Sequence, residues 1–181
     1  VTGVQTCALP IFGTLDRADS GKLKIGGEEI TKLGQRQLAV FRNKNIGFVF
    51  QQHHLLPEFS ALENICMPAF IAGAGKSDAG KNAADLLRLL HLEDRQHHRP
   101  SELSGGEQQR VAVARALINK PKVVFADEPS GNLDSAAANS LHNLFFDLRK
   151  QLNQTFVIVT HNSQLADMAD RKLTMKDGVI V

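Results

Sequence analysis

Two neighbouring carboxylates, Asp127 and Glu128, follow an apolar run in the segment KVVFADEP (122–129). Because the run has no alternating polar residues, it predicts a strand that is covered on both faces. Open α/β folds bind ligands at the carboxyl edge of their sheets. There, an aspartate can reach a Mg²⁺ ion bound to phosphates, and a glutamate can take a proton from an attacking water. Taken alone, the pattern also fits a strand that merely ends in polar residues.

Two further polar residues come directly after predicted strands. His161 ends the segment TFVIVTH (155–161), which is also expected to be covered on both faces, and Gln51 follows NIGFVF (45–50). At the same sheet edge, a histidine can hydrogen-bond a phosphate, and a glutamine can help to order a water or a Mg²⁺ ion. A satisfied residue at the end of a strand is the simpler interpretation for either one by itself.

The segment LSGGEQQR (103–110) combines a helix start with a pair of glycines. Ser104 and Glu107 have the spacing of a capping box, ahead of a helix over 107–118. Unpaired N–H groups at a helix N-terminus bind anions, and glycines let a phosphate come close to the backbone. The segment therefore predicts a helix N-terminus that is also suited to a phosphate.

Alternating strands and helices must position these residues. The two apolar strands alternate with helices expected over 136–152 and 163–170, which predicts a parallel α/β sheet. Between Gln52 and Gly105 the chain is mostly helix and loop, so an all-helical insertion is expected there. Within it, residues 83–92 form an amphipathic helix and residues 72–81 are the most linker-like stretch.

Two hairpins and a short helix complete the expected elements. Gly26-Gly27 turns a hairpin over 21–30, and Asp177-Gly178 turns another over 171–181. A short helix over 36–42 precedes the strand that ends before Gln51.

The bulk composition excludes several classes of protein. The 181 residues are 43% hydrophobic and carry a net charge of +2, which gives no electrostatic footprint for nucleic acid. The two cysteines, Cys7 and Cys66, provide neither a disulfide framework nor a metal spacing. Because no apolar run reaches the length of a membrane span, contact with a membrane is expected only through a partner.

The order of these motifs is more specific than any one of them. Gln51, a helical insertion, LSGGEQQR, VVFADEP, SGNLD (130–134) and His161 follow one another as they do in ATP-binding cassette (ABC) ATPases, which residues 13–181 closely resemble. The resemblance implies an α/β P-loop NTPase fold with a mostly parallel core sheet, an antiparallel β part and a helical insert. It also implies ATP and Mg²⁺ as cofactors.

The resemblance assigns roles to individual residues. It makes Glu128 the catalytic base, His161 the switch histidine and Gln51 the Q-loop glutamine, all three counted as catalytic. The remaining assignments are nucleotide contacts at the signature residues Ser104, Gly105 and Gly106, at Gln108, at the Walker B aspartate Asp127 and at the D-loop aspartate Asp134. Mg²⁺ is expected near Gln51 and Asp127, held through phosphates and water.

Finer likeness points to one branch of the family. Residues 47–73, 97–117 and 125–135 are similar to the ATPases of lipoprotein-releasing systems (the LolD type). The resemblance implies a homodimer that drives transmembrane permease subunits and lies on the cytoplasmic face of the bacterial inner membrane. ATPases of macrolide efflux and of the FtsE type share much of this pattern and stay as alternatives. ABC ATPases that act on nucleic acid interrupt the cassette with long coiled coils, whereas only about 50 residues without heptads separate Gln51 from Ser104 here.

The phosphate-binding Walker A motif, GxxxxGK[ST], is missing from the sequence. Gly75-Lys76-Ser77 is a false match, because Phe70 stands where the motif needs its first glycine and no strand precedes it. A flexible loop is expected there instead. The family places this motif just before a stretch like GTLDRADSG (13–21).

Residues 1–11, VTGVQTCALPI, fit nothing that follows them. They show no amphipathic period, Pro10 is expected to break a helix, and the string is identical to the translation of a common sequencing adapter. We expect residues 1–11 to be an artefact that replaces the Walker A region and the first strands. Neighbouring core strands would then be partly unpaired and the chain as written inactive, whereas the parent protein would be the ATPase. A non-enzymatic degenerate fragment stays as an alternative.

The resemblance divides the chain into four parts: the artefact 1–11, a remnant of the N-terminal core and β subdomain over 12–51, a helical signature subdomain over 52–106, and the C-terminal half of the RecA-like core over 107–181.

Overall fold

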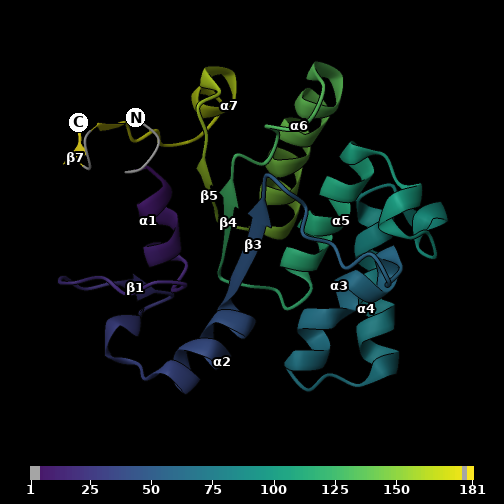
Figure 1. The fold of residues 1–181 in the computed structure, drawn as a ribbon, viewed down its shortest axis with the longest axis horizontal. Coiled ribbons are helices and arrows are strands. Elements are labelled where there is room, and N and C mark those ends of the chain that lie inside the picture. The colour runs from purple at the N-terminus through teal and green to yellow at the C-terminus, as the bar shows by residue number, and fades with distance from the viewer. Residues whose placement is uncertain (1–4, 177–178) are drawn as a thin grey trace.

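A three-stranded parallel sheet forms the centre of the computed structural model, which describes residues 5–176 and 179–181 (Figure 1). The strand order is β3 (Ile46–Phe50), β4 (Val123–Asp127) and β5 (Phe156–Val159). The register pairs Phe50 with Asp127, and Asp127 with Val159. The three carboxyl ends therefore meet at one edge, and the predicted parallel α/β core is confirmed.

Helices and short antiparallel strands surround this sheet. They are α1 (Gln5–Phe12), β1 (Lys24–Ile25), β2 (Glu28–Glu29), the 3₁₀ turn Ile30–Lys32, α2 (Gln35–Asn45), α3 (Ala61–Ile71), α4 (Lys76–Leu89), the 3₁₀ turns Glu93–Arg95 and Pro100–Glu102, α5 (Gly105–Leu117), α6 (Ser135–Leu152), α7 (Ser163–Asp167), β6 (Met175–Lys176) and β7 (Val179–Ile180). Within the described residues, no helix is both long and apolar enough to cross a membrane.

Both faces of β4 are buried, as its unbroken apolar sequence predicts. Val124 and Ala126 belong to one core cluster with α5, α6 and the helical insertion. Val123 and Phe125 belong to a second cluster, which includes residues of α1, α2 and the β1–β2 hairpin. Figure 1 accordingly shows α5 and α6 on one side of the sheet and α1 on the other.

The edge strand β5 departs from the expectation that both its faces are covered. Val157 is 40% exposed, and no residue of the strand is fully buried. Within the described part of the chain, β5 pairs only with β4. The apolar sequence of β5 predicts burial of both its faces, but the described elements cover these faces only in part.

Helix α5 packs unusually close to β3 because one residue of the strand is a glycine. A Cβ atom built on Gly47 would lie 2.4 Å from the carbonyl oxygen of Ala116, well inside van der Waals contact. The absence of a side chain at Gly47 lets the helix backbone lie against the strand. This contact helps to set the position of α5 along β3, and so its distance from the carboxyl edge of the sheet.

The helical insertion expected between β3 and α5 is confirmed by α3 and α4. The predicted Ser60–Glu63 capping box begins α3, with Ser60 Oγ accepting from the Glu63 N–H at 3.3 Å. Helix α4 begins at Lys76, so the expectation of a linker over 72–81 is wrong for its second half. The reason is visible in hindsight, since Ala79, Ala83 and Leu87 recur with a helical period and are all fully buried.

Helix α1 runs through Pro10, so the expectation that Pro10 breaks a helix is wrong. The proline removes one intrahelical donor, but the helix continues past it. Gly13 N–H donates to the Leu9 carbonyl at 2.7 Å, and Leu15 N–H donates to the Pro10 carbonyl at 2.8 Å. Leu9 is only 3% exposed and packs in the second core cluster, which offsets the cost of the lost bond.

Both predicted hairpins form. In the first, Ile25 pairs with Glu28 across Gly26 and Gly27, whose φ angles of +58° and +85° suit a two-residue turn that favours glycine. In the second, Met175 pairs with Ile180. Its expected turn at Asp177-Gly178 lies outside the described residues.

Candidate functional site

The carboxyl edge of the sheet gathers the polar residues that follow the three core strands. Gln51 comes after β3, Asp127 and Glu128 end β4, and Thr160 and His161 come after β5. The parallel register brings these positions together although they are far apart in sequence. The juxtaposition predicted for Gln51, Asp127, Glu128 and His161 at one edge therefore follows from the strand pairing.

The carboxylate of Glu128 is held against the chain that leaves β5. Its Oε1 accepts from the backbone N–H of His161 at 2.9 Å and lies 2.8 Å from His161 Nδ1. Thr160 Oγ1 donates to Oε2 at 3.3 Å. The His161 side chain is 80% exposed and that of Glu128 is 24% exposed, so the pair faces solvent while its orientation is fixed from one side.

Backbone conformation also sets the direction of Glu128. Its φ is +43°, in the left-handed region that residues with a side chain seldom adopt. The Glu128 N–H nevertheless donates to the Val159 carbonyl at 2.9 Å, which continues the β4–β5 ladder by one residue. The left-handed backbone at Glu128 therefore sets the direction in which its side chain leaves the end of β4.

Asp127 is half-buried and carries an unfavourable charge. Burial raises the pKa of its carboxyl, and the neighbouring Glu128 charge raises it further. A bound cation would relieve both effects, and oxygen donors of this kind are the ligands that Mg²⁺ prefers. Gln51 Nε2 donates a hydrogen bond to Asn132 Oδ1 at 3.0 Å. The amide oxygen of Gln51 is therefore the atom that could coordinate a cation.

The described residues by themselves do not form a metal cage. Within residues 5–176 and 179–181, no group of three or more His, Cys, Asp or Glu side chains is arranged to hold a metal ion. The donor set at Asp127 and Gln51 suits a Mg²⁺ ion that keeps most of its other ligands from phosphate oxygens and water. It does not suit a structural metal.

Gln51 is also tied to the loop that follows Glu128. Asn132 Nδ2 donates back to the Gln51 carbonyl at 3.2 Å, so the two residues exchange hydrogen bonds. A Cβ atom on Gly131 would lie 2.7 Å from Gln51 Nε2, so the glycine makes room for the glutamine side chain. The loop between Glu128 and Asp134 is thereby coupled to the end of β3.

The N-termini of α5 and α6 form a second group of predicted site residues. Gly105 faces Leu133 and Gly106 faces Ala137, with ordinary van der Waals spacing for a built Cβ atom. Asp134 caps α6, accepting from the Ala137 N–H at 2.8 Å. Two helix N-termini therefore lie side by side at this surface, which concentrates unpaired N–H groups.

Ser104 caps α5 in the predicted capping box. Its Oγ accepts from the Glu107 N–H at 3.3 Å and donates to Glu107 Oε2 at 2.8 Å. The hydrogen bond from the Ser104 backbone N–H is the main cause that lowers the pKa of Glu107, and Arg95 contributes through a contact of 2.9 Å. Ser104 and Gly105 are exposed, so they are accessible to a ligand or to another chain.

The side-chain amide of Gln108, a residue also predicted to bind nucleotide, forms hydrogen bonds within the chain. Its Nε2 donates to the carbonyls of Pro100 at 2.9 Å and Leu103 at 3.0 Å. These bonds close the loop that leads into α5. The nucleotide contact predicted for Gln108 stays a prediction.

Sequence reasoning missed Gln109, which is fully buried beneath the sheet edge. It lies one turn before Ala112 and Val113, on the stripe of α5 that is otherwise apolar. A polar residue on the buried stripe of an amphipathic helix is a signal that could have identified it.

The GKS sequence at residues 75–77 is the start of a helix, as noted above. Gly75 is the residue before α4, and the preceding element is helix α3. The expectation that this is no P-loop is supported, because a P-loop joins a strand to a helix. The prediction of a flexible loop is wrong for Lys76 and Ser77.

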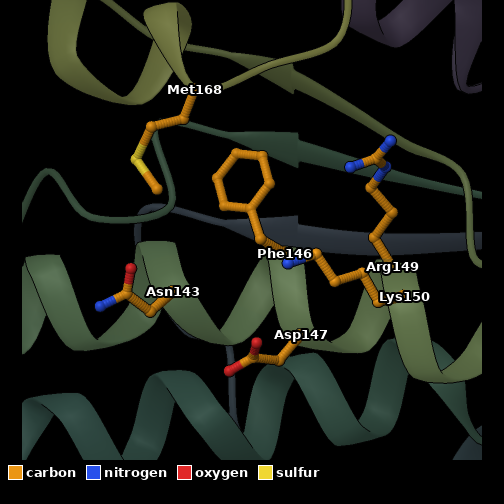
Figure 2. Close-up of a pocket in the computed structure, with 6 residues that line it drawn as sticks. All are labelled: Asn143, Phe146, Asp147, Arg149, Lys150 and Met168. Atoms are coloured by element: carbon orange, nitrogen blue, oxygen red, sulfur yellow. The ribbon is translucent and has the colours of Figure 1, made fainter.

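A hollow between α6 and the end of α7 lies away from the sheet edge (Figure 2). Its lining residues are Asn143, Phe146, Asp147, Arg149, Lys150 and Met168. It is open to solvent and contains none of the predicted site residues.

Comparison with known proteins yields one family and a consistent set of relatives. The family model described as ABC transporter matches residues 6–131. The chain is 60% identical over 177 residues to the "Lipoprotein-releasing system ATP-binding protein LolD" of Cytophaga hutchinsonii, covering 98% of this chain and 81% of the relative. The protein of the same name in Bacteroides thetaiotaomicron is 56% identical over 97% of this chain and 81% of its own length.

Solved structures agree with this result. The ATP-binding cassette MJ0796, in a dimeric post-hydrolysis state bound to ADP and Pi, superposes with a TM-score of 0.85 at 36% identity. The match covers 97% of this chain and 78% of the cassette. A second dimeric structure of the same bacterial ABC transporter cassette gives the same TM-score at 37% identity.

Proposed function

The chain belongs to the ABC transporter family, in its ATP-binding subunits of the LolD type, and from this premise we propose that it hydrolyses ATP to drive the release of lipoproteins from the bacterial inner membrane. The observation that carries the proposal is the Glu128 carboxylate, oriented by His161 beside a half-buried Asp127. Relatives that are 50–60% identical over nearly the whole chain are named for lipoprotein release, and they support lipoproteins as the transported class.

Glu128 is the group that accepts a proton from the attacking water. It is an ionisable carboxylate at the ligand-binding edge, and its contacts with the backbone and hydroxyl of the β5 end keep it from turning away. His161, largely exposed, would hydrogen-bond the γ-phosphate that is transferred to water, with ADP as the leaving group. Preorganisation of the Glu128 carboxylate lowers the barrier because this group needs no reorientation during the reaction.

Asp127 and Gln51 would hold Mg²⁺, which neutralises charge on the phosphates when it is bound. Asp127 contributes a carboxylate that is destabilised without a cation, and Gln51 contributes its amide oxygen. The exchange of hydrogen bonds between Gln51 and Asn132 links this part of the site to the loop that leads to Asp134.

A second copy of the chain completes each site in this proposal. Ser104, Gly105 and Gly106 lie at the exposed N-terminus of α5, beside the N-terminus of α6, and would bind the nucleotide of the partner cassette. The dimeric cassettes that superpose on this chain support such a homodimer. Transmembrane permease subunits would dock on the helical insertion, so contact with the cytoplasmic face of the membrane comes through partners.

The residues described here do not include a phosphate-cradling loop. The sequence has no GxxxxGK[ST] motif, and the GKS at 75–77 begins a helix. We therefore expect the 181-residue chain by itself to release no phosphate from ATP. A 181-residue preparation that turns over ATP at the rate of a complete cassette would overturn this part of the proposal.

The test uses the protein that the natural locus of this chain encodes, called the natural gene product below. It is purified with the permeases encoded beside it and reconstituted in vesicles that carry a tagged lipoprotein. ATP-dependent release of the lipoprotein to an acceptor supports the proposal. ATP hydrolysis that is stimulated by a macrolide, or that accompanies no release, would instead favour an efflux or FtsE-type role.

A further inference from the structure

We propose that Gln109 is a positioning residue that holds Gln51 and Glu128 in register through the backbone on either side of the site. This inference rests on the proposed ATPase function and adds a residue to it. Gln109 lies on α5, three positions after the signature glycine Gly106, and its own exposure is 0%.

One side-chain nitrogen joins the ends of two core strands. Gln109 Nε2 donates to the Phe50 carbonyl at 3.1 Å and to the Pro129 carbonyl at 2.7 Å. Phe50 directly precedes Gln51, and Pro129 directly follows Glu128. Because a peptide unit is planar, fixing the Phe50 carbonyl fixes the plane from which Gln51 departs. Fixing the carbonyl of Pro129, whose φ is locked by its ring, restrains the residue next to Glu128.

The amide of Gln109 can have only one orientation. Both of its hydrogen atoms face backbone carbonyls, so its oxygen is the atom that faces His53 Nδ1, and this oxygen can only accept. The hydrogen bond therefore requires that His53 carries its proton on Nδ1. The tautomer of His53 reports on the Gln109 network without reference to catalysis.

The next turns of α5 strengthen the same attachment. Arg115 donates to the carbonyls of His53 at 2.8 Å and His54 at 2.6 Å. Arg115 is half-buried, and this burial lowers the pKa of its guanidinium. The segment after β3 is thus bound to α5 at two places, and Gln109 is the one that also reaches the loop after Glu128.

Loss of the Gln109 amide leaves the buried Pro129 carbonyl and the partly buried Phe50 carbonyl without these donors. Such groups find other partners only if the backbone moves. Movement at Phe50 and Pro129 changes the positions of Gln51 and Glu128 while leaving Ser104 and Asp134 in place. The expected signature is a slower chemical step with little change in nucleotide affinity, because a small misplacement of a catalytic group is costly.

The experiment compares Gln109→Met with Gln154→Met in the natural gene product. Gln154 is a matched control: it is also buried, and its Nε2 donates to a backbone carbonyl, that of Thr155, at the opposite end of the sheet. We expect Gln109→Met to lower kcat by about ten- to a hundredfold, with KM for ATP nearly unchanged, and Gln154→Met to leave both nearly unchanged. An unchanged kcat in Gln109→Met, or an equal loss in both variants, would overturn the proposal.

A second measurement separates failure of this inference from failure of the proposed function. Nitrogen-15 NMR of the imidazole should show His53 protonated on Nδ1 in the unsubstituted protein and a change of tautomer in Gln109→Met. If the unsubstituted protein hydrolyses no ATP, the proposed function fails, and the NMR result alone decides the geometry. A His53 ring protonated on Nε2 in the unsubstituted protein would show that the network does not exist.

Discussion

The carboxylate of Glu128 lies 2.8 Å from Nδ1 of His161 and accepts the backbone N–H of the same residue at 2.9 Å. One histidine therefore contacts Glu128 through both its backbone and its ring. Since the backbone contact does not depend on the rotamer of the ring, Glu128 keeps its direction when the exposed imidazole turns toward a ligand. The two roles expected of this pair, accepting a proton and binding a phosphate, can thus be served without losing alignment.

Replacement of this carboxylate gives the most direct test of the chemistry. Glu128→Gln preserves the shape of the side chain and removes its ability to accept a proton. We expect kcat for ATP hydrolysis in the natural gene product to fall by about 10²- to 10⁴-fold, while a fluorescent ATP analogue still binds. Glu28→Gln, at an exposed position of the β1–β2 hairpin, is the control and should leave hydrolysis unchanged. Full activity in Glu128→Gln would remove Glu128 from the role of base.

The raised pKa of Asp127 predicts how an Asp127→Asn substitution changes the stability of the protein at different pH values. Because burial and the Glu128 charge raise the pKa in the folded state, the ionised carboxylate costs folding free energy, and this cost disappears as the pH falls through the folded-state pKa. Asp127→Asn should therefore raise Tm of the nucleotide-free protein at pH 7. The gain should shrink toward pH 4.

Thermal unfolding between pH 4 and pH 8 measures this difference. Addition of Mg²⁺ and ATP should stabilise the unsubstituted protein more than Asp127→Asn, because the cation site has lost its carboxylate. A lower Tm for Asp127→Asn at pH 7 without nucleotide would show that the carboxylate is stabilised in the apo protein.

The two capping boxes allow structural and functional roles of Ser104 to be separated. Ser60 and Ser104 each accept from the N–H of a glutamate three residues later at 3.3 Å. Substitution of either serine by alanine should cost about 1 kcal/mol of unfolding free energy. Only Ser104→Ala should also slow ATP hydrolysis, since Ser60 begins α3 in the helical insertion. Denaturant unfolding and phosphate release on both variants check this, and equal hydrolysis rates would reduce Ser104 to a cap.

Substitution by alanine should have opposite effects on stability at two glycines, Gly47 and Gly80. Gly47→Ala places a methyl group 2.4 Å from the Ala116 carbonyl and should destabilise the protein by about 1–3 kcal/mol. Gly80 lies inside α4, and the described residues place no neighbour within 4 Å of a Cβ there beyond its own helix backbone. Gly80→Ala should stabilise the protein by about 0.5–1 kcal/mol. Urea unfolding of both variants measures the difference, and a neutral Gly47→Ala would mean that α5 can move away from β3.

Much of the fold could be predicted because its signals are local. Apolar runs predicted β3, β4 and β5, and the two Ser–Glu pairs predicted where α3 and α5 begin. The edge that unites Gln51, Glu128 and His161 was also predictable, since parallel strands present their carboxyl ends together.

The errors arose where tertiary packing outweighs a local preference. Pro10 lies inside a helix because Leu9 is buried against the sheet, and residues 76–81 are helical because Ala79 packs in the core. Gln109 was missed for a related reason. Its importance depends on three partners that are distant in sequence, Phe50, His53 and Pro129, and no spacing rule connects them.

The strand order has a consequence for how the site is assembled during folding. Ile46 pairs with Val123, so the whole helical insertion lies between two neighbours in the sheet. Such non-local pairing forms slowly, because the loop must close before the contact contributes. The hydrogen bonds within helices α3, α4 and α5 join residues that are close in sequence, so we expect these helices to form before β3 pairs with β4. We expect the edge that carries Gln51 and Glu128 to be among the last parts to form, because it requires β3 to pair with β4 across the insertion.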